Sequence, residues 1–202
     1  MKNDIHFWAA TLVRGVLALL VGSAVLVIPD MATTLLLLPF AVAISILCLA
    51  AYGMIDSAII FITSFMAASP RVRIALCLQG IMGSLVGILL FFVVFDKVRL
   101  HWFLYLIGLQ ALCTAVAEWI VARHAFTEGA SRWNYAAAVI ALLCGCVYTV
   151  GAAKFGSDLL PRTVALLVFG YLIAFGMAEC ITAARMLYAD REAALIGAVC
   201  EA

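Results

Sequence analysis

Residues 74–95 read IALCLQGIMGSLVGILLFFVVF, a run of 22 residues without Asp, Glu, Lys or Arg. A helix needs about 20 mainly apolar residues to cross the hydrocarbon core of a membrane. The run is continuous and does not alternate between apolar and polar residues, as a strand of a membrane β-barrel would. This segment therefore predicts a transmembrane helix.

The rest of the chain has the same character. Of its 202 residues, 68% are hydrophobic and 11% are charged, and the mean hydropathy is +1.22. Soluble domains are about 45–50% apolar and about 25% charged. This composition argues against a soluble enzyme and a disordered regulator, and the net charge of +1 argues against nucleic acid as a partner. The fold class we predict is an all-α membrane protein.

Six apolar segments are long enough to span, and together they form a single transmembrane domain over residues 1–202. We place the spans at 8–28, 34–64, 74–95, 102–123, 134–154 and 161–187. The predicted connections contain Pro29-Asp30, Ser69-Pro70-Arg71, Asp96-Lys97, residues 128–131 and residues 156–158. Five similar spans follow the first one, so we do not interpret it as a cleaved signal peptide.

The distribution of Lys and Arg predicts the orientation of the spans. If the N-terminus is cytoplasmic, eight Lys and Arg residues fall on the cytoplasmic side and four on the other side. Short cytoplasmic loops carry an excess of basic residues. We therefore predict that both termini are cytoplasmic.

Three carboxylates lie inside the predicted spans at regular intervals. Asp56, Glu118 and Glu179 are 62 and 61 residues apart, and each is on an even-numbered span. Gly53 and Gly176 precede two of these acids by three residues, and Ala115 has the same place before Glu118.

Small residues repeat with the same period on the odd-numbered spans. They occur at i, i+3 and i+7 as Gly15, Ala18 and Gly22, as Gly80, Gly83 and Gly87, and as Ala138, Ala141 and Gly145. Such a stripe lets helix backbones approach closely in lipid, and we prefer this packing role to a pore lined by glycines. The repeats predict three tandem hairpins, at about 8–66, 74–126 and 133–188, related by pseudo-threefold symmetry about the membrane normal.

The carboxylates inside the spans allow three interpretations. They can form a polar clasp, in which Arg14 pairs with Asp56, Gln79 bonds to Glu118, and Glu179 uses Asn134, Arg185 or a neighbouring repeat. They can instead surround a shared axis and take up protons in mild acid, because like charges repel and burial disfavours ionisation. In the third interpretation, they are solvated at the membrane interface.

No catalytic, cofactor or metal-binding motif stands out in the sequence. The chain has seven cysteines, six of them within spans, and its three histidines lie near helix ends. Cysteine within a span is usually a small packing residue. We therefore predict a non-enzymatic protein without a cofactor or metal.

The repeated motifs resemble the HdeD-like membrane proteins of bacteria over residues 8–188. The resemblance consists of the G-x₆-G spacing in the first helix of a hairpin, G-x-x-E late in the second, and Pro29-Asp30 between them. The second repeat departs from this pattern at Asp96, which has no preceding proline, and at Ala115. The resemblance implies a protein of the bacterial inner membrane that is associated with acid resistance.

The main functional hypothesis is a non-enzymatic role in stress or acid tolerance, through membrane structure or interaction. One alternative is a small transporter or channel that uses the intramembrane carboxylates. Another is a lipid-binding or assembly subunit of a membrane complex. The expected partners are membrane lipids and either a second copy or another membrane protein.

Overall fold

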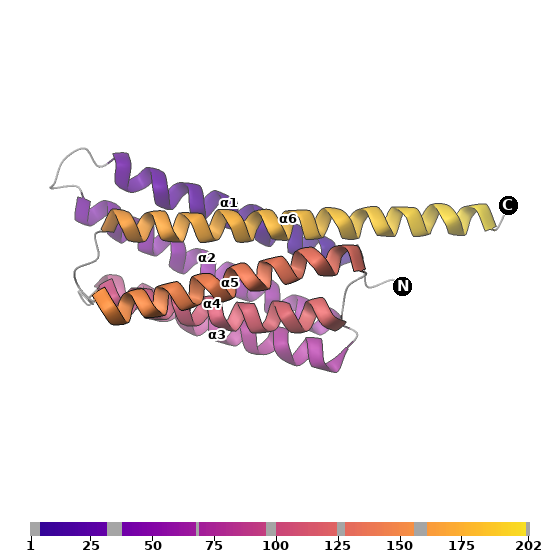
Figure 1. The fold of residues 1–202 in the computed structure, drawn as a ribbon, viewed down its shortest axis with the longest axis horizontal. Coiled ribbons are helices and arrows are strands. Elements are labelled where there is room, and N and C mark those ends of the chain that lie inside the picture. Colours follow the sequence, from indigo (N-terminus) through magenta and orange to yellow (C-terminus); the bar gives the residue numbers. More distant parts are fainter. Residues whose placement is uncertain are drawn as a thin grey trace.

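The computed structural model describes residues 5–31, 38–67, 69–95, 100–124, 128–155 and 161–200. These residues form long helices that lie alongside one another (Figure 1). The helices are α1 (Ile5–Met31), α2 (Leu38–Met66), α3 (Pro70–Phe95), α4 (Leu100–His124), α5 (Glu128–Phe155) and α6 (Pro161–Cys200). The predicted all-α fold is confirmed.

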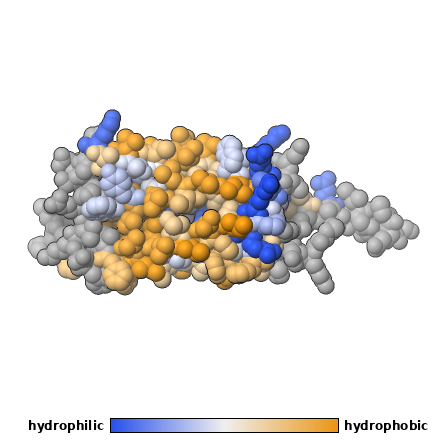
Figure 2. Space-filling model, turned by 90° about the horizontal axis from the view of Figure 1, so that it is seen from below, coloured by the Kyte–Doolittle hydropathy of each residue, from blue (hydrophilic) through white to orange (hydrophobic). Residues whose placement is uncertain are grey.

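All six helices are long and apolar enough to cross a membrane, and on that basis the chain is a multi-pass membrane protein. On the face that Figure 2 shows, apolar residues cover the middle of the bundle, and hydrophilic residues lie beside them. We call the end of the bundle where α1 begins and α6 ends the terminal end, and the opposite end the distal end (Figure 1). Six exposed arginines lie toward the terminal end: Arg71, Arg73, Arg123, Arg132, Arg185 and Arg191.

Two helix starts differ from the predicted spans. Residues 34–37, predicted as the start of the second span, lie outside the described residues, and α2 begins at Leu38. Helix α3 begins at Pro70, four residues earlier than predicted. There the carbonyl oxygen of Ser69 accepts a hydrogen bond from the backbone N–H of Arg73 at 3.0 Å. Proline suits this first turn because its missing N–H would have no partner in the helix.

Two predicted connections were wrong, and α6 extends beyond its membrane-spanning part, which ends at Ala189, close to the predicted residue 187. Pro29 and Asp30 belong to the last residues of α1, and residues 128–131 form the start of α5. Proline near a helix end removes only one terminal hydrogen bond, so it need not stop the helix. Helix α6 continues to Cys200 rather than ending at residue 187, because neither glycine nor proline occurs between residues 188 and 196. The connections at 96–97 and 156–158 lie outside the described residues.

The helices form a closed ring in which each one packs against two neighbours. Packing is most extensive between α1 and α6, between α2 and α3, and between α4 and α5. The hairpins α1–α2, α3–α4 and α5–α6 pack less extensively. The closest helix pairs therefore lie between the predicted hairpins rather than within them.

The small-residue stripes explain this preference. A β-carbon added to Gly87 of α3 would lie 2.8 Å from Cγ of Met54 in α2, and one added to Gly145 of α5 would lie 2.8 Å from Cγ of Leu112 in α4. A β-carbon on Gly22 of α1 would lie 3.0 Å from that of Leu172 in α6. Each odd helix thus directs its stripe at an even helix outside its own hairpin. All six glycines predicted to pack against other helices are buried: Gly15, Gly22, Gly80, Gly83, Gly87 and Gly145.

The apolar core is divided into two parts along the bundle axis. The larger part fills the distal half and includes Leu104, Tyr148 and Val168. The smaller part lies near the terminal end and consists of Ile60, Ala67, Val72, Leu76 and Val121, with Phe7 packed against it. Polar side chains separate the two parts, and they form the candidate site.

Candidate functional site: a buried polar layer

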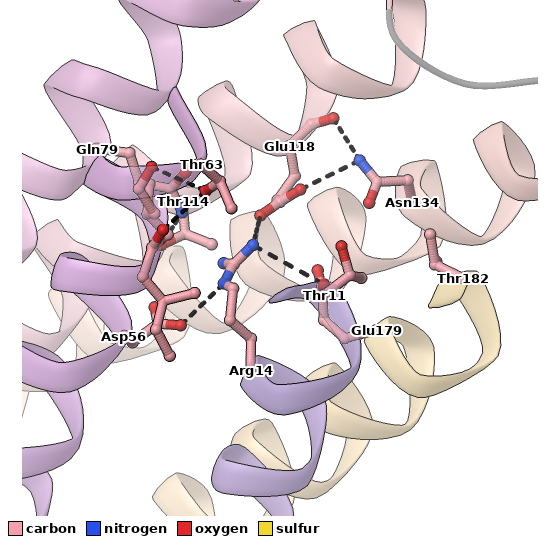
Figure 3. A network of polar contacts seen from close by, with 12 residues as sticks. Thr11, Arg14, Asp56, Thr63, Gln79, Thr114, Glu118, Asn134, Glu179 and Thr182 are labelled. Atoms are coloured by element: carbon pink, nitrogen blue, oxygen red, sulfur yellow. Dashed lines mark hydrogen bonds and ion pairs between the residues drawn. The ribbon is translucent and has the colours of Figure 1, made fainter. Parts of the chain in front are cut away.

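Each of the six helices contributes one polar side chain to a layer at the centre of the bundle (Figure 3). The exposed fractions of these residues range from 0% to 6%. We call this set the polar layer: Arg14 (α1), Asp56 (α2), Gln79 (α3), Glu118 (α4), Asn134 (α5) and Glu179 (α6).

Arg14 is the cation of the polar layer. Its Nε donates to Oδ1 of Asp56 at 2.8 Å, and its Nη1 donates to Oε1 of Glu118 at 3.0 Å. The same Nη1 lies 3.8 Å from Oε2 of Glu179, and the guanidinium carbon lies 5.9 Å from the ring centre of Phe175. The structure contains the predicted Arg14–Asp56 pair, and it places two further carboxylates around the same arginine.

Close helix packing sets the position of Arg14 relative to Glu179. A β-carbon added to Gly15 would lie 2.9 Å from the carbonyl oxygen of Gly176 and 2.7 Å from Sγ of Cys180. Helices α1 and α6 can therefore meet only because these positions lack side chains. Arg14 precedes Gly15 and Glu179 follows Gly176 by three residues, so the contact between the two helices brings the two charged groups together.

The predicted hydrogen bond from Gln79 to Glu118 was wrong, and of the three alternatives predicted for Glu179 only the neighbouring repeat holds, through Arg14 at 3.8 Å. Gln79 donates from Nε2 to Oγ1 of Thr114 at 3.4 Å, not to Glu118. Asn134 donates to Glu118 rather than to Glu179. Its Nδ2 donates to the backbone oxygen of Glu118 at 2.9 Å and to Oε2 of the same residue at 3.1 Å. Both carboxylate oxygens of Glu118 are thereby occupied. Arg185, the other suggested partner of Glu179, is exposed.

The interpretation of the acids as solvated interfacial groups was also wrong, since Asp56, Glu118 and Glu179 are only 4%, 2% and 0% exposed.

The place of Asn134 in the polar layer was not predicted, although the sequence contains a signal for it. Ala137 has the place of Arg14 in the third repeat, and Asn134 lies three residues earlier. Residues three apart share a helix face, so Asn134 could have been assigned to this layer.

The polar layer contains more carboxyl groups than cations. One guanidinium faces three carboxyl groups, which leaves two excess negative charges if all of them are ionised. Several buried atoms have no hydrogen-bond partner, and most of them are acceptors: Oε1 and Oε2 of Glu179, Oε1 of Gln79, Oε1 of Gln110, Oγ of Ser57 and Nη2 of Arg14. Buried polar atoms normally find partners, so the unpartnered oxygens mark where this layer can take up a donor.

Two small cavities flank the polar layer. The distal cavity has a volume of about 50 Å³ and extends from Asp56 past Tyr52, Gln110 and Tyr171. The terminal cavity is about 10 Å³ and is bordered by Arg14, Glu118, Asn134 and Glu179. A volume of about 10–15 Å³ is enough for one water molecule, so both cavities are on the scale of water.

Within the described ranges, no group of three or more His, Cys, Asp or Glu side chains is arranged to hold a metal ion. The six cysteines found there are free thiols. Among the acids of the polar layer, the guanidinium of Arg14 already contacts Asp56, Glu118 and Glu179. The carboxyl, guanidinium and amide groups of this layer can support hydrogen bonding and proton exchange.

Comparison with models of protein families, with curated proteins and with solved structures found no match for this chain. The function must therefore be inferred from the polar layer and from its place in a membrane-spanning bundle. That inference depends on how many charges the layer holds and on how well each charge is paired.

Proposed function

We propose that this chain is a non-enzymatic, multi-pass protein of the bacterial inner membrane that binds protons at its polar layer and supports acid tolerance. The observation that carries the proposal is the presence of three carboxyl groups around a single buried arginine. The resemblance to HdeD-like proteins points to the same physiological setting.

The charge imbalance supports proton binding over a purely structural role. Transferring a charge from water into a protein interior costs several kcal/mol unless it is paired and hydrogen-bonded. Asp56 and Glu118 each accept a hydrogen bond from Arg14, whereas Glu179 accepts none. A proton bound to this layer would remove one excess charge, so uptake is favoured when protons become abundant.

Proton uptake by the purified protein in liposomes tests this proposal. On acidification in an unbuffered suspension with a pH indicator, we expect the wild type to bind more protons than a variant in which Asp56, Glu118 and Glu179 are changed to Asn, Gln and Gln. Glu192→Gln is the matched control, because Glu192 is exposed on α6. The control should leave the uptake that depends on these three acids unchanged.

The polar-clasp interpretation predicts no difference in proton uptake between these two proteins. If the layer serves only to hold the helices together, the triple variant and the wild type will bind equal numbers of protons above the range of exposed carboxylates. That equality would refute the proposed function. Bacteria that depend on this protein for survival in acid should also lose survival with the triple variant and keep it with Glu192→Gln.

Proton passage across the membrane is a second candidate, because cavities lie on both sides of the polar layer. The distal cavity reaches Asp56 and the terminal cavity reaches Glu179, with Arg14 between the two acids. Liposomes containing a trapped pH dye and a potassium diffusion potential separate the two functions. A passage function requires proton flux above that of empty liposomes, whereas a binding function does not.

We further propose that the three hairpins are related by a pseudo-threefold axis along the membrane normal, and that both termini are cytoplasmic. Equivalent contacts of the odd helices support the first part: Gly22 approaches Leu172, Gly87 approaches Ala50, and Gly145 approaches Leu112. The arginines toward the terminal end support the second part, since basic residues prefer the cytoplasmic side.

A further inference from the structure

The terminal cavity lies between the polar layer and the smaller part of the core. Its polar wall is formed by side chains from five helices: Thr11, Arg14, Thr63, Glu118, Asn134 and Glu179. Phe7, Ala10, Leu76 and Val121 complete it. The volume of about 10 Å³ matches the space that a single water molecule needs.

The hydroxyl and amide donors on this wall are already in use, whereas Nη2 of Arg14 has no hydrogen-bond partner. Thr11 donates to the backbone oxygen of Phe7 at 3.0 Å, and Thr63 donates to that of Ile59 at 2.8 Å. Asn134 directs its amide nitrogen at Glu118. The wall therefore has no hydroxyl or amide hydrogen left over for Glu179.

Glu179 is the carboxyl group that lacks a donor. It is 0% exposed, both of its oxygens are without a hydrogen bond, and Nη1 of Arg14 is 3.8 Å from Oε2. That distance exceeds a charge-assisted hydrogen bond, which is about 2.7–2.9 Å. Glu179 can gain a donor in two ways: by binding a proton itself, or from a water-sized molecule in the cavity.

We propose that the terminal cavity is a binding site for one water molecule, and that Glu179 exchanges a proton through this water with the terminal side of the membrane. This inference rests on the proposed proton-binding function and names the residue and the route. In the exchange, a hydronium ion at the terminal side releases a proton and becomes water, and an O–H bond forms at a carboxyl oxygen of Glu179. No bond to carbon changes, and no electrons are transferred between reactants.

The other charged groups around Glu179 favour this residue as the acceptor. Arg14 on α1 pairs directly with Asp56 on α2 and with Glu118 on α4, and such hydrogen bonds favour the charged form of a carboxyl group. Helices α3 and α5 contribute only the neutral Gln79 and Asn134 to the layer. Protonation of Glu179 therefore lowers the charge excess without breaking either short ion pair.

We assign the route to the terminal cavity, because its lining residues differ from those of the distal cavity. Glu179 and Arg14 border the terminal cavity. The distal cavity reaches the layer at Asp56 and has neither of them among its lining residues. A proton that arrives from the distal side would first meet Asp56, which is already paired with Arg14 at 2.8 Å.

Infrared spectroscopy of the full chain in liposomes tests both parts of the inference. In acid, a protonated carboxyl group gives a carbonyl band, and transfer to D₂O shifts this band as its proton is replaced. We expect the band in wild type and in Glu192→Gln, which changes an exposed residue of α6, and its loss in Glu179→Gln. Persistence of the band in Glu179→Gln would assign the proton to another residue and overturn the inference, although the proposed function would stand.

Cavity-filling variants test the route. Thr11→Leu and Ala10→Leu fill the terminal cavity from two positions, and Gly53→Leu is the matched control in the distal cavity. A β-carbon on Gly53 has only Gly87 within 4 Å, at 3.9 Å. We expect the first two variants to slow the D₂O shift by about tenfold, equivalent to ~1.4 kcal/mol of added barrier. The control should leave the rate unchanged.

Each remaining outcome has a defined meaning. Slowing by Gly53→Leu but not by Thr11→Leu or Ala10→Leu would overturn the terminal route. Loss of the band on adding sodium or ammonium chloride at constant pH would show that the cavity takes a cation instead of water. Absence of any carboxyl band in acid would contradict the proposed function itself. Thermal unfolding of every variant identifies those that fold, and the comparison uses at least one folded filling variant.

Discussion

Gly15 of α1 and Gly176 of α6 face each other so closely that neither can carry a side chain. A β-carbon added to Gly176 would lie 2.8 Å from the carbonyl oxygen of Gly15, and one added to Gly15 would lie 2.9 Å from the carbonyl oxygen of Gly176. This contact joins the first and last helices, closes the ring and brings Arg14 to within 3.8 Å of Glu179.

The first prediction uses two glycines on the same helix. Gly176→Ala should lower the free energy of unfolding by about 1–3 kcal/mol, because the added methyl group overpacks the contact with α1. Gly170→Ala should have no such cost, because nothing lies within 4 Å of a β-carbon there. Thermal unfolding in detergent and in nanodiscs measures both. Equal effects at the two positions would show that close packing at Gly176 contributes nothing to stability.

The second prediction concerns the cation of the polar layer. Arg14→Gln should be more destabilising at neutral pH than Asp56→Asn, because it leaves three carboxyl groups without their cation. Removing one partner of a buried ion pair typically costs about 3–5 kcal/mol. The loss for Arg14→Gln should shrink in mild acid as carboxyl groups bind protons. Unfolding curves at both pH values measure this difference.

A double variant sharpens the same test. Arg14→Gln combined with Asp56→Asn should recover part of the stability that Arg14→Gln loses, since one stranded carboxylate is removed. Recovery should be incomplete because Glu118 and Glu179 remain. Strictly additive losses would contradict the contacts of Arg14 with these acids.

The third prediction distinguishes two polar residues at the start of α5. Asn134→Ala should cost about 1–3 kcal/mol, because it leaves the carboxylate oxygen Oε2 of Glu118 without a donor. It should also increase proton uptake by the layer. Ser131→Ala removes a hydrogen bond to the backbone of Ala122 and should leave proton uptake unchanged. Uptake that is the same in both variants would rule out a role for Asn134 in keeping Glu118 charged.

The fourth prediction concerns orientation. In a cysteine-free background, a cysteine in place of the exposed Arg132 should react with an impermeant thiol reagent from the cytoplasmic side. A cysteine in place of the exposed Lys154, near the distal end of the same helix, should react from the other side. The reverse pattern would place the termini outside the cytoplasm.

Much of the helical architecture could be predicted from the sequence, because apolar segments of this length have few alternatives in a membrane. Helix ends were less predictable. Pro29 marked the end of a span in the sequence, yet α1 includes it. Helix α6 likewise continues beyond residue 187, because a change from apolar to polar composition does not by itself end a helix.

The candidate site was predicted in composition and only partly in connectivity. Spacing identified Asp56, Glu118 and Glu179, and position in the first hairpin suggested Arg14 for Asp56. That reasoning treated each hairpin as a unit, so it missed that Arg14 also reaches Glu118 on α4. Contacts between hairpins depend on how the ring closes, and spacing along the chain does not specify this closure.

Closure of the ring by α1 and α6 also has a consequence for how the protein is made. Gly15 is synthesised 161 residues before Gly176. At about 5–20 residues per second, the interval between the two is roughly 8–30 s. Throughout that interval α1 is in the membrane without its closest neighbour, and the charge of Arg14 must already be neutralised. Asp56, only 42 residues later, is the first carboxylate to reach it. Of the three acids of the polar layer, Asp56 is therefore the only one available to pair with Arg14 until Glu118 has been made.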